Sequence, residues 1–247
     1  MQWLVSGKRV PVEVRVNNET EYAQIRQHHN AAGLIDSLTY TVETGSGAGR
    51  SGCRHTVTAD KRFRVKEIKG SEHEHLLHTA FLLRQHWLQG PISLLVAILV
   101  HFSVDGVPLI VMVNHDVSGE CHDIKGRSSR DDDVRFKHFV ADKTFDEANH
   151  HEVTERVQSD LEFLSRTYRV TDYSIILWQA PDANVLHLAI VDYLQPDSLV
   201  KKTERTIVRV FRQPTPTRPT EYARRLLDDW KRCVIPLHRR PTPAFSP

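Results

Sequence analysis

The sequence predicts an α+β fold with antiparallel sheets. Several short stretches alternate between apolar and polar residues as β-strands do, and some are joined by turn residues as hairpins. Four longer stretches have the character of helices, at residues 21–36, 72–88, 146–167 and 219–233. The 247 residues are 40% apolar and 26% charged, a globular composition that excludes disordered, collagen-like and disulfide-scaffold proteins.

Strands are expected around the second helical stretch and again later in the chain. Each is short, rich in apolar or β-branched residues and bounded by turn residues. They lie at residues 38–44, 53–58, 63–68, 92–103, 108–114, 174–179 and 185–191. Asp105-Gly106 and residues 181–184 are expected to turn the last four into two hairpins. In the last helix, Tyr222, Leu226 and Trp230 are spaced four apart, which predicts a buried face.

Charge is distributed unevenly along the chain. Residues from 201 onward carry twelve Lys and Arg against four Asp and Glu, a net of +8, whereas residues 1–200 carry a net of −6. A basic end on an acidic body suggests an anionic partner such as phosphate, nucleic acid or a lipid surface, with a solvated basic tail as the alternative.

Cysteine usage and hydropathy suggest a soluble cytoplasmic protein. The three cysteines, Cys53, Cys121 and Cys233, are far apart and lack zinc-site spacing, which favours a reducing compartment and no structural zinc. The longest apolar run, residues 92–100, is half of what a bilayer span needs, and the N-terminus does not have the pattern of a signal peptide.

A glycine-rich turn is the first candidate for chemistry. Residues 47–52 match the pattern GxGxxG, which in dinucleotide-binding folds is followed directly by a helix. Here residues 53–58 are strand-like instead. Strand, glycine turn and strand is the arrangement in which kinases fold backbone N–H groups over the phosphates of ATP. A glycine turn without a ligand is the alternative.

A lysine is expected one strand after such a loop. Lys66 lies 14 residues beyond Gly52, and alternation sets it on the opposite face of the strand from Phe63. Glu72 and Glu74 open the next helix and are the candidate carboxylates to hold this lysine, with Glu74 favoured. An ordinary exposed lysine is the alternative.

Two aspartates flank the second hairpin. Asp172 precedes the first strand and Asp192 follows the second, symmetrically about residue 182. In a symmetric register they would face each other with Cβ atoms about 5 Å apart. Such a pair suits phosphoryl transfer, in which one carboxylate orients the attacking hydroxyl and the other holds Mg²⁺. Two strand-end turn residues are the alternative. The sequence contains no His-Arg-Asp and no Asp-Phe-Gly, which argues against a conventional protein kinase.

Histidines are numerous in two of the predicted helices. His75 and His78 have the i, i+3 spacing of a possible metal pair, and His73 precedes them. No acidic or cysteine partner follows at zinc spacing, so surface histidines are the favoured interpretation, here and at His150-His151.

Seven segments in sequence resemble the phosphatidylinositol phosphate kinase family, over roughly residues 30–233. The first three segments lie between residues 50 and 127. Arg50-Ser51-Gly52 with the stretch Arg62-Phe63-Arg64-Val65-Lys66-Glu67-Ile68 is similar to the family's glycine loop and RFxxKTI strand, Met112-Val113-Asn114 is similar to MNN, and residues 122–127 (HDIKGR) are similar to YDLKGS. Later, residues 171–177 (TDYSIIL) resemble MDYSLLL, residues 189–195 (AIVDYLQ) GIIDILQ, residues 201–204 (KKTE) KKxE, and residues 219–225 (PTEYARR) PxxYAxRF.

The resemblance implies a two-lobed kinase-like fold with an ATP cleft between lobes. The whole chain, 1–247, would be one compact lipid kinase domain, with an N-lobe at about 20–112, a C-lobe at about 113–235 and a Pro-rich tail at 236–247. It also implies ATP and Mg²⁺ as cofactors, a phosphoinositide substrate, no nucleic acid, and peripheral association with an anionic membrane.

The resemblance also assigns roles to single residues. Lys66 would contact the ATP phosphates, Asp172 would be the catalytic aspartate and Asp192 the Mg²⁺ ligand, while Asp123 and Lys125 match other active-site positions. Nucleotide binding would further involve Gly49, Ser51, Gly52, Glu74, Met112 and Asn114. Binding of the lipid headgroup would involve Arg130, Lys201, Lys202 and Glu204.

Glu204 implies a particular substrate. In the family, an acid at this position accompanies phosphorylation of phosphatidylinositol 4-phosphate to the 4,5-bisphosphate, whereas alanine accompanies use of the 5-phosphate isomer. The chain departs from the family at Arg127, at Thr171 and at residues 141–145 (ADKTF in place of KDxDF), and these departures concern headgroup binding. A catalytically weak phosphoinositide-binding module and a kinase of soluble inositol phosphates are the alternatives.

Overall fold

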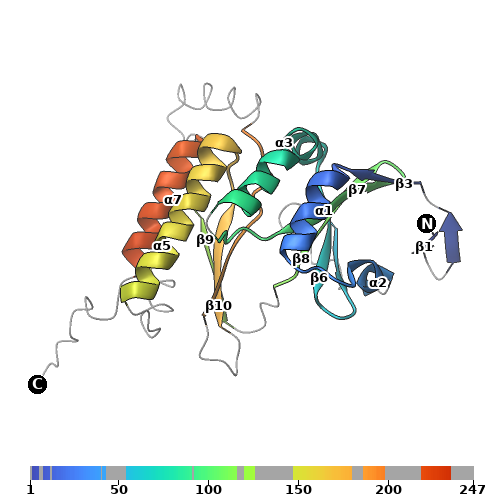
Figure 1. Cartoon of the computed structure of the whole chain (residues 1–247), viewed down its shortest axis with the longest axis horizontal. Helices are drawn as coiled ribbons and strands as arrows, with labels where there is room; N and C mark the ends of the chain where they lie inside the picture. Colours follow the sequence, from blue (N-terminus) through green and yellow to red (C-terminus); the bar gives the residue numbers. More distant parts are fainter. Residues whose placement is uncertain are drawn as a thin grey trace, which may run out of the picture. The chain divides into compact units, whose positions relative to one another are not determined.

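The computed structural model describes residues 2–5, 8–11, 13–39, 41–42, 54–90, 92–115, 120–125, 147–179, 186–197 and 218–234 (Figure 1). The chain divides into two compact units. The first combines Met1–Gly90 with Val96–Asp116, and the second combines Pro91–Leu95 with Val117–Pro247. Within the described residues every strand in a sheet pairs antiparallel with its neighbours, as the sequence predicts for an α+β fold.

A six-stranded sheet forms the centre of the first unit. Its strand order is β3-β7-β8-β6-β5-β4. The strands are β3 (Val14–Asn17), β4 (Thr41–Val42), β5 (His55–Thr58), β6 (Phe63–Glu67), β7 (Ile98–Val104) and β8 (Val107–Val113). A separate two-stranded sheet contains β1 (Gln2–Val5) and β2 (Lys8–Pro11).

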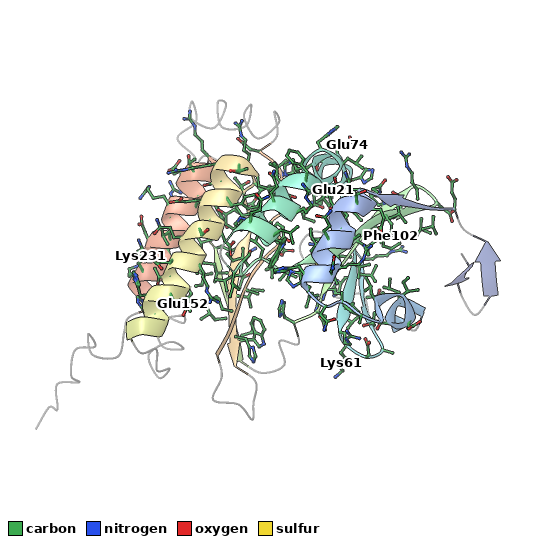
Figure 2. All side chains as sticks on the ribbon, in the orientation of Figure 1. Glu21, Lys61, Glu74, Phe102, Glu152 and Lys231 are labelled. Atoms are coloured by element: carbon green, nitrogen blue, oxygen red, sulfur yellow. The ribbon has the colours of Figure 1, made fainter. Side chains whose placement is uncertain are left out.

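Two tight turns of the first unit follow from local chemistry. Asp105 and Gly106 have φ angles of 48° and 81°, which is the positive-φ pair of a two-residue hairpin turn, so the predicted turn between β7 and β8 is confirmed. Lys61 of the β5–β6 turn, labelled in Figure 2, has φ 59°. Asp60 of this turn accepts hydrogen bonds from Ser37 and Thr58, and these bonds lower its pKa to about 2.

Helix α1 (Glu19–His28) packs against strand β7 of this sheet and against helix α3 (Gly70–Gln89). The buried side chains of α3 are spaced three or four apart, as a helix with one apolar stripe requires: they are Leu76, Ala80, Leu83 and Trp87. From α1, the Arg26 guanidinium donates to the carbonyl oxygen of Leu99 in β7 at 2.9 Å. This contact ties α1 to β7, the second strand of the sheet.

Three sequence predictions fail in this unit. The strand expected at residues 38–44 begins only at Thr41, because residues 38 and 39 belong to a helix. The single helix expected at residues 21–36 is two helices, α1 and the short α2 (Leu34–Thr39), because the chain takes positive φ at Asn30 (47°) and Gly33 (74°). The strand expected from residue 92 begins only at Ile98, since residues 92–97 have no ladder partner of their own apart from a single bridge at Leu95.

The described residues of the second unit include a three-stranded sheet and the helices α5 and α7. Its strand order is β11-β10-β9, from β9 (Glu120–Lys125), β10 (Ser174–Gln179) and β11 (Leu186–Val191). Helix α5 (Glu147–Glu162) continues into a π-helical turn, η1 (Phe163–Thr167), and lies beside α7 (Pro219–Cys233), as Figure 1 shows. Tyr222, Leu226 and Trp230 are all buried, which confirms the predicted apolar face of α7.

Candidate active site

One edge of the three-stranded sheet gathers the predicted catalytic residues of the second unit. Asp172 lies two residues before β10 begins, and Asp192 directly follows β11. Ser174 at the start of β10 pairs with Val191 on one side and with Lys125 on the other. Because neighbouring antiparallel strands alternate in direction, the start of β10 and the ends of β9 and β11 meet at the same edge. Asp172, Asp192 and Lys125 are therefore brought to one place by the topology.

Both aspartates have left-handed backbones. The φ angle is 67° at Asp172 and 60° at Asp192. Aspartate tolerates this region better than most residues, but the conformation still costs about 1–3 kcal/mol and persists only where the surroundings enforce it. Such conformations concentrate at functional sites, and two of them beside one sheet edge single out this edge.

Backbone contacts beyond the end of the hairpin hold the two aspartates in these left-handed conformations. Val170 forms a bridge with Pro196, and the Thr171 N–H donates to the carbonyl oxygen of Gln195 at 3.1 Å. From Val170 to Ser174 the chain advances four residues, whereas the opposite segment advances five, from Val191 to Pro196. The extra residue makes a bulge-like irregularity, which bends the chain and turns side chains away from their regular positions.

The predicted symmetric register of the two aspartates is wrong by one residue. Since Ser174 pairs with Val191, extending the ladder sets Asp192 against Tyr173 and not against Asp172. The same shift runs along the whole ladder, from Gln179 opposite Leu186 to Ser174 opposite Val191, and the alternation of residues within each strand does not specify it. The loop at residues 180–185 lies outside the described residues. The two aspartates share an edge but are not a cross-strand pair.

Asp123 and Lys125 lie on the accessible face of β9. Their side chains form an ion pair at 3.9 Å and are 50% and 42% exposed, respectively. The register places Asp123 in one row with Ile176 and Ala189, and Lys125 in one row with Ser174 and Val191. An ion pair so exposed contributes little to stability, so these charges are available for a ligand.

Ser174 is a residue that the sequence analysis missed. Its hydroxyl is fully buried and has no hydrogen-bond partner among the described residues. A buried hydroxyl without a partner is costly, and this one shares its row with Lys125 at the edge that carries the aspartates. The only signal in the sequence was its place in the segment 171–177.

Lys66 lies on β6 of the first unit, on the face that the sequence predicts. Phe63 and Val65 are buried on one face, while Arg64 and Lys66 are partly exposed on the other. The register places Lys66 between His55 of β5 and Ile110 of β8. Met112 pairs with Arg64, which is the next residue pair on the same face of the sheet. Lys66 and Met112, both predicted to bind nucleotide, therefore share a face.

Glu74 and Glu72 make contacts that do not involve Lys66. The Glu74 side chain is 66% exposed and forms an ion pair with His78 at 4.0 Å, on the outside of α3 (Figure 2). Glu72 accepts a hydrogen bond from the Lys69 N–H at 2.8 Å and so caps the start of α3. The reason is the phase of the helix, because Glu74 lies two residues from the buried position Leu76 and hence on the opposite side. Pairing of Glu74 with Lys66 stays a prediction.

Asn114 uses its side-chain amide inside the first unit. Its Oδ1 accepts hydrogen bonds from Nε and Nη2 of Arg64, both at 3.2 Å, and its Nδ2 donates to the carbonyl oxygen of Lys61 at 2.7 Å. Its backbone N–H donates to Arg62 at 2.9 Å. Asn114 thus clamps the β5–β6 hairpin, and contact with nucleotide stays a prediction for this residue.

The remaining predicted site residues lie outside the described part of the chain. They are Gly49, Ser51 and Gly52 of the glycine turn and the headgroup candidates Arg130, Lys201, Lys202 and Glu204. Their roles stay predictions.

The prediction that these histidines lie at the surface is confirmed for some of them and wrong for others. His78 and His151 are largely exposed, as expected. His75 is largely buried, and this burial together with the nearby His78 lowers its pKa to about 4. His73 Nδ1 lies 2.8 Å from Nε2 of the buried His101. Within the described residues no group of three or more His, Cys, Asp or Glu gathers as a metal site.

Comparison with known proteins adds the family to this geometry. A model of the Phosphatidylinositol-4-phosphate 5-Kinase family matches residues 37–184, more than half of the chain, so the chain belongs to this family. It is therefore a phosphatidylinositol phosphate kinase, a transferase that acts on a lipid substrate and uses ATP. The match includes Lys66, Asp123, Lys125 and Asp172, and it ends before Asp192.

A search among curated proteins found no match. Among the described helices, none is long and apolar enough to cross a membrane.

Proposed function

We propose that this kinase transfers the γ-phosphoryl group of ATP to the 5-hydroxyl of phosphatidylinositol 4-phosphate and makes the 4,5-bisphosphate. The observation that carries this proposal is the edge of the second unit's sheet, where Asp172, Asp192 and Lys125 meet within a chain of the phosphatidylinositol phosphate kinase family. The finer choice of substrate depends on Glu204.

Each charged group at the edge has a proposed task. The Asp172 carboxylate accepts a hydrogen bond from the attacking hydroxyl and orients it toward the phosphorus. Lys125 balances negative charge on the transferring phosphoryl group, and Asp123 holds Lys125 in place through the ion pair at 3.9 Å. Lys66, from the other unit, contacts the ATP phosphates, as Gly49, Ser51 and Gly52 do through their N–H groups.

Mg²⁺ fits the donor set at this edge. In kinases this ion is held by one or two carboxylates, with phosphate and water oxygens completing its shell, so a cluster of three protein ligands is not required. Asp192, with Asp172 at the same edge, supplies carboxylates of this kind. When bound, Mg²⁺ neutralises charge that develops on the phosphate oxygens.

We also propose that the whole chain is one kinase domain. The unit that contains Lys66 would be the N-lobe and the unit that contains the aspartates the C-lobe, as in a two-lobed kinase with ATP between lobes. The headgroup would be bound by Arg130, Lys201, Lys202 and Glu204, at an anionic membrane to which the basic end of the chain contributes.

The substrate choice is tested by comparing three acceptors with radiolabelled ATP. These are vesicles with phosphatidylinositol 4-phosphate, vesicles with the 5-phosphate isomer, and soluble inositol phosphates. We expect the first to be preferred. Glu204→Ala should lower its use and raise use of the 5-phosphate isomer, shifting the ratio of kcat/KM about ten- to hundredfold, because one or two charge-assisted contacts are rearranged.

A matched control and clear contrary results accompany this assay. Glu155→Ala changes an exposed glutamate of α5 and should leave the ratio unaltered. An unchanged ratio in Glu204→Ala would contradict the substrate assignment. Phosphorylation of soluble inositol phosphates alone would favour a kinase of soluble substrates, and lipid binding without transfer would favour a binding module.

A further inference from the structure

Tyr222 of α7 contacts the main chain immediately beside Asp172. Its hydroxyl donates a hydrogen bond to the carbonyl oxygen of Tyr173, the residue that follows Asp172. Helix α7 begins at Pro219, so Tyr222 lies in its first turn. The bond joins two segments that are 49 residues apart in the sequence.

The surroundings of this hydrogen bond are dry. The rings of Tyr173 and Tyr222 meet edge to face, with centroids 4.9 Å apart and planes at 73°. Tyr173 is 0% exposed and Tyr222 is 1% exposed. A phenylalanine at position 222 would fill the same space and keep the ring contact. The hydroxyl therefore does something that core packing alone does not require.

What the hydroxyl does follows from the backbone of Asp172. On the N-terminal side of this residue, the Thr171 N–H is held by the carbonyl oxygen of Gln195 at 3.1 Å. On the C-terminal side, the carbonyl of Tyr173 is held by Tyr222. Asp172 lies between these two anchors with φ 67°. A residue with a Cβ atom leaves this region readily when it is free to do so, and that change would swing the carboxylate to another direction.

We infer that Tyr222 is a positioning residue, whose hydroxyl holds the main chain at Tyr173 and thereby keeps the Asp172 carboxylate directed at the reacting hydroxyl of the substrate. The inference rests on the proposed function, because it presumes that Asp172 orients that hydroxyl. Tyr222→Phe keeps nearly the same side-chain volume, so it should lower turnover only if the hydroxyl positions Asp172.

The test compares Tyr222→Phe with a control that removes a different hydrogen bond of α7. In wild type, Trp230 Nε1 donates to the Thr154 hydroxyl at 3.1 Å, which joins α7 to α5. Thr154→Val removes this bond and leaves the contact at Tyr173 intact. Both variants of the full chain are assayed well below their unfolding midpoints, with phosphatidylinositol 4-phosphate vesicles and MgATP, and kcat and the KM for ATP are determined separately.

We expect kcat of Tyr222→Phe to fall about tenfold with KM for ATP unchanged, because a misdirected carboxylate affects the transition state and not nucleotide binding. Thr154→Val should keep the wild-type kcat even if its unfolding midpoint falls by as much as that of Tyr222→Phe. A Tyr222→Phe enzyme with wild-type kcat would overturn the inference, and so would an equal loss of kcat in both variants.

Hydrogen exchange supplies a readout that does not depend on turnover. Amides of residues 171–174 should exchange faster in Tyr222→Phe than in wild type and in Thr154→Val. Unchanged exchange there would overturn the inference on its own. A wild-type chain that transfers no phosphate to any phosphoinositide would contradict the proposed function, whereas the exchange experiment would still decide whether Tyr222 holds this segment.

Discussion

Asp172 and Asp192 show how single residues acquire a function from the local backbone. Neither is directed by a regular strand, since each lies just beyond one and has positive φ. Their placement depends on the bridge of Val170 with Pro196 and on the bond from Thr171 to Gln195. The residue types were evident from the sequence, but the one-residue shift in register was not, because alternation within the strands does not specify which residues pair.

At the same scale, three histidines of the first unit link its stability to pH. Burial is the largest cause that lowers the pKa of His29, His75 and His101 to about 4 in each case. The nearby histidines His28 and His115 act on His29, His78 acts on His75, and His73 acts on His101, all in the same direction. The folded state therefore keeps these imidazoles neutral, whereas the unfolded chain protonates them near pH 6.5.

Stability should accordingly be full above about pH 6.5 and fall as the pH decreases from there toward 4, by at most about 1.4 kcal/mol per pH unit for each histidine. Urea unfolding at several pH values measures this slope. His101→Gln should reduce the slope, while His151→Gln, which changes an exposed histidine of the second unit, should leave it as it is. Stability that is constant or rises on acidification would contradict the account.

At the scale of elements, the sequence predicted the helices and turns that a short stretch of residues specifies by itself. The β7–β8 hairpin was evident because Asp105-Gly106 alone specifies its turn, and α7 because its apolar residues repeat at four. The break between α1 and α2 was missed, although Asn30 and Gly33 are residues that tolerate positive φ. β3 was not expected as a strand, since its partner β7 lies far along the chain and no local pattern specifies such pairing.

Two glycines of the first unit allow the hairpin turn to be tested. An added Cβ atom would meet nothing within 4 Å at Gly106 or at Gly70, but only Gly106 has positive φ. Gly106→Ala should therefore destabilise the protein by about 1–2 kcal/mol through the backbone alone. Gly70→Ala, at the start of α3, should be neutral or stabilise by up to about 1 kcal/mol. Equal effects of the two substitutions on urea unfolding would contradict this assignment of the turn.

At the scale of the whole molecule, the charge distribution suggests how the kinase meets its lipid. Residues beyond 200 carry a net charge of +8. Basic residues near an anionic surface contribute about 1 kcal/mol each, and salt weakens this attraction. In flotation assays the full chain should bind vesicles that contain phosphatidylserine, and should bind neutral vesicles much less. Binding that is equal on both, or that does not respond to salt, would contradict a membrane role for the basic end.

The family and the main candidate residues could be predicted from the sequence, because short motifs in a fixed order indicate a family without any knowledge of contacts. The partners of those residues could not. Glu74 pairs with His78 because of the phase of α3, and Asn114 clamps a hairpin; pairing of Glu74 with Lys66 and contact of Asn114 with nucleotide stay predictions. Side-chain partners depend on helix phase and on pairing across the sheet, which a motif does not contain.

The central claim is that this chain transfers phosphate to a phosphoinositide through Asp172. The most direct measurement is transfer of label from γ-labelled ATP to phosphatidylinositol 4-phosphate vesicles by wild type, Asp172→Asn and Asp228→Asn, with and without Mg²⁺. Asp228 is an exposed carboxylate of α7 and serves as the matched control. We predict labelled bisphosphate from wild type and the control only with Mg²⁺, and a rate at least about 100-fold lower from Asp172→Asn. Wild-type activity in Asp172→Asn, or no transfer by the wild-type chain, would contradict the claim.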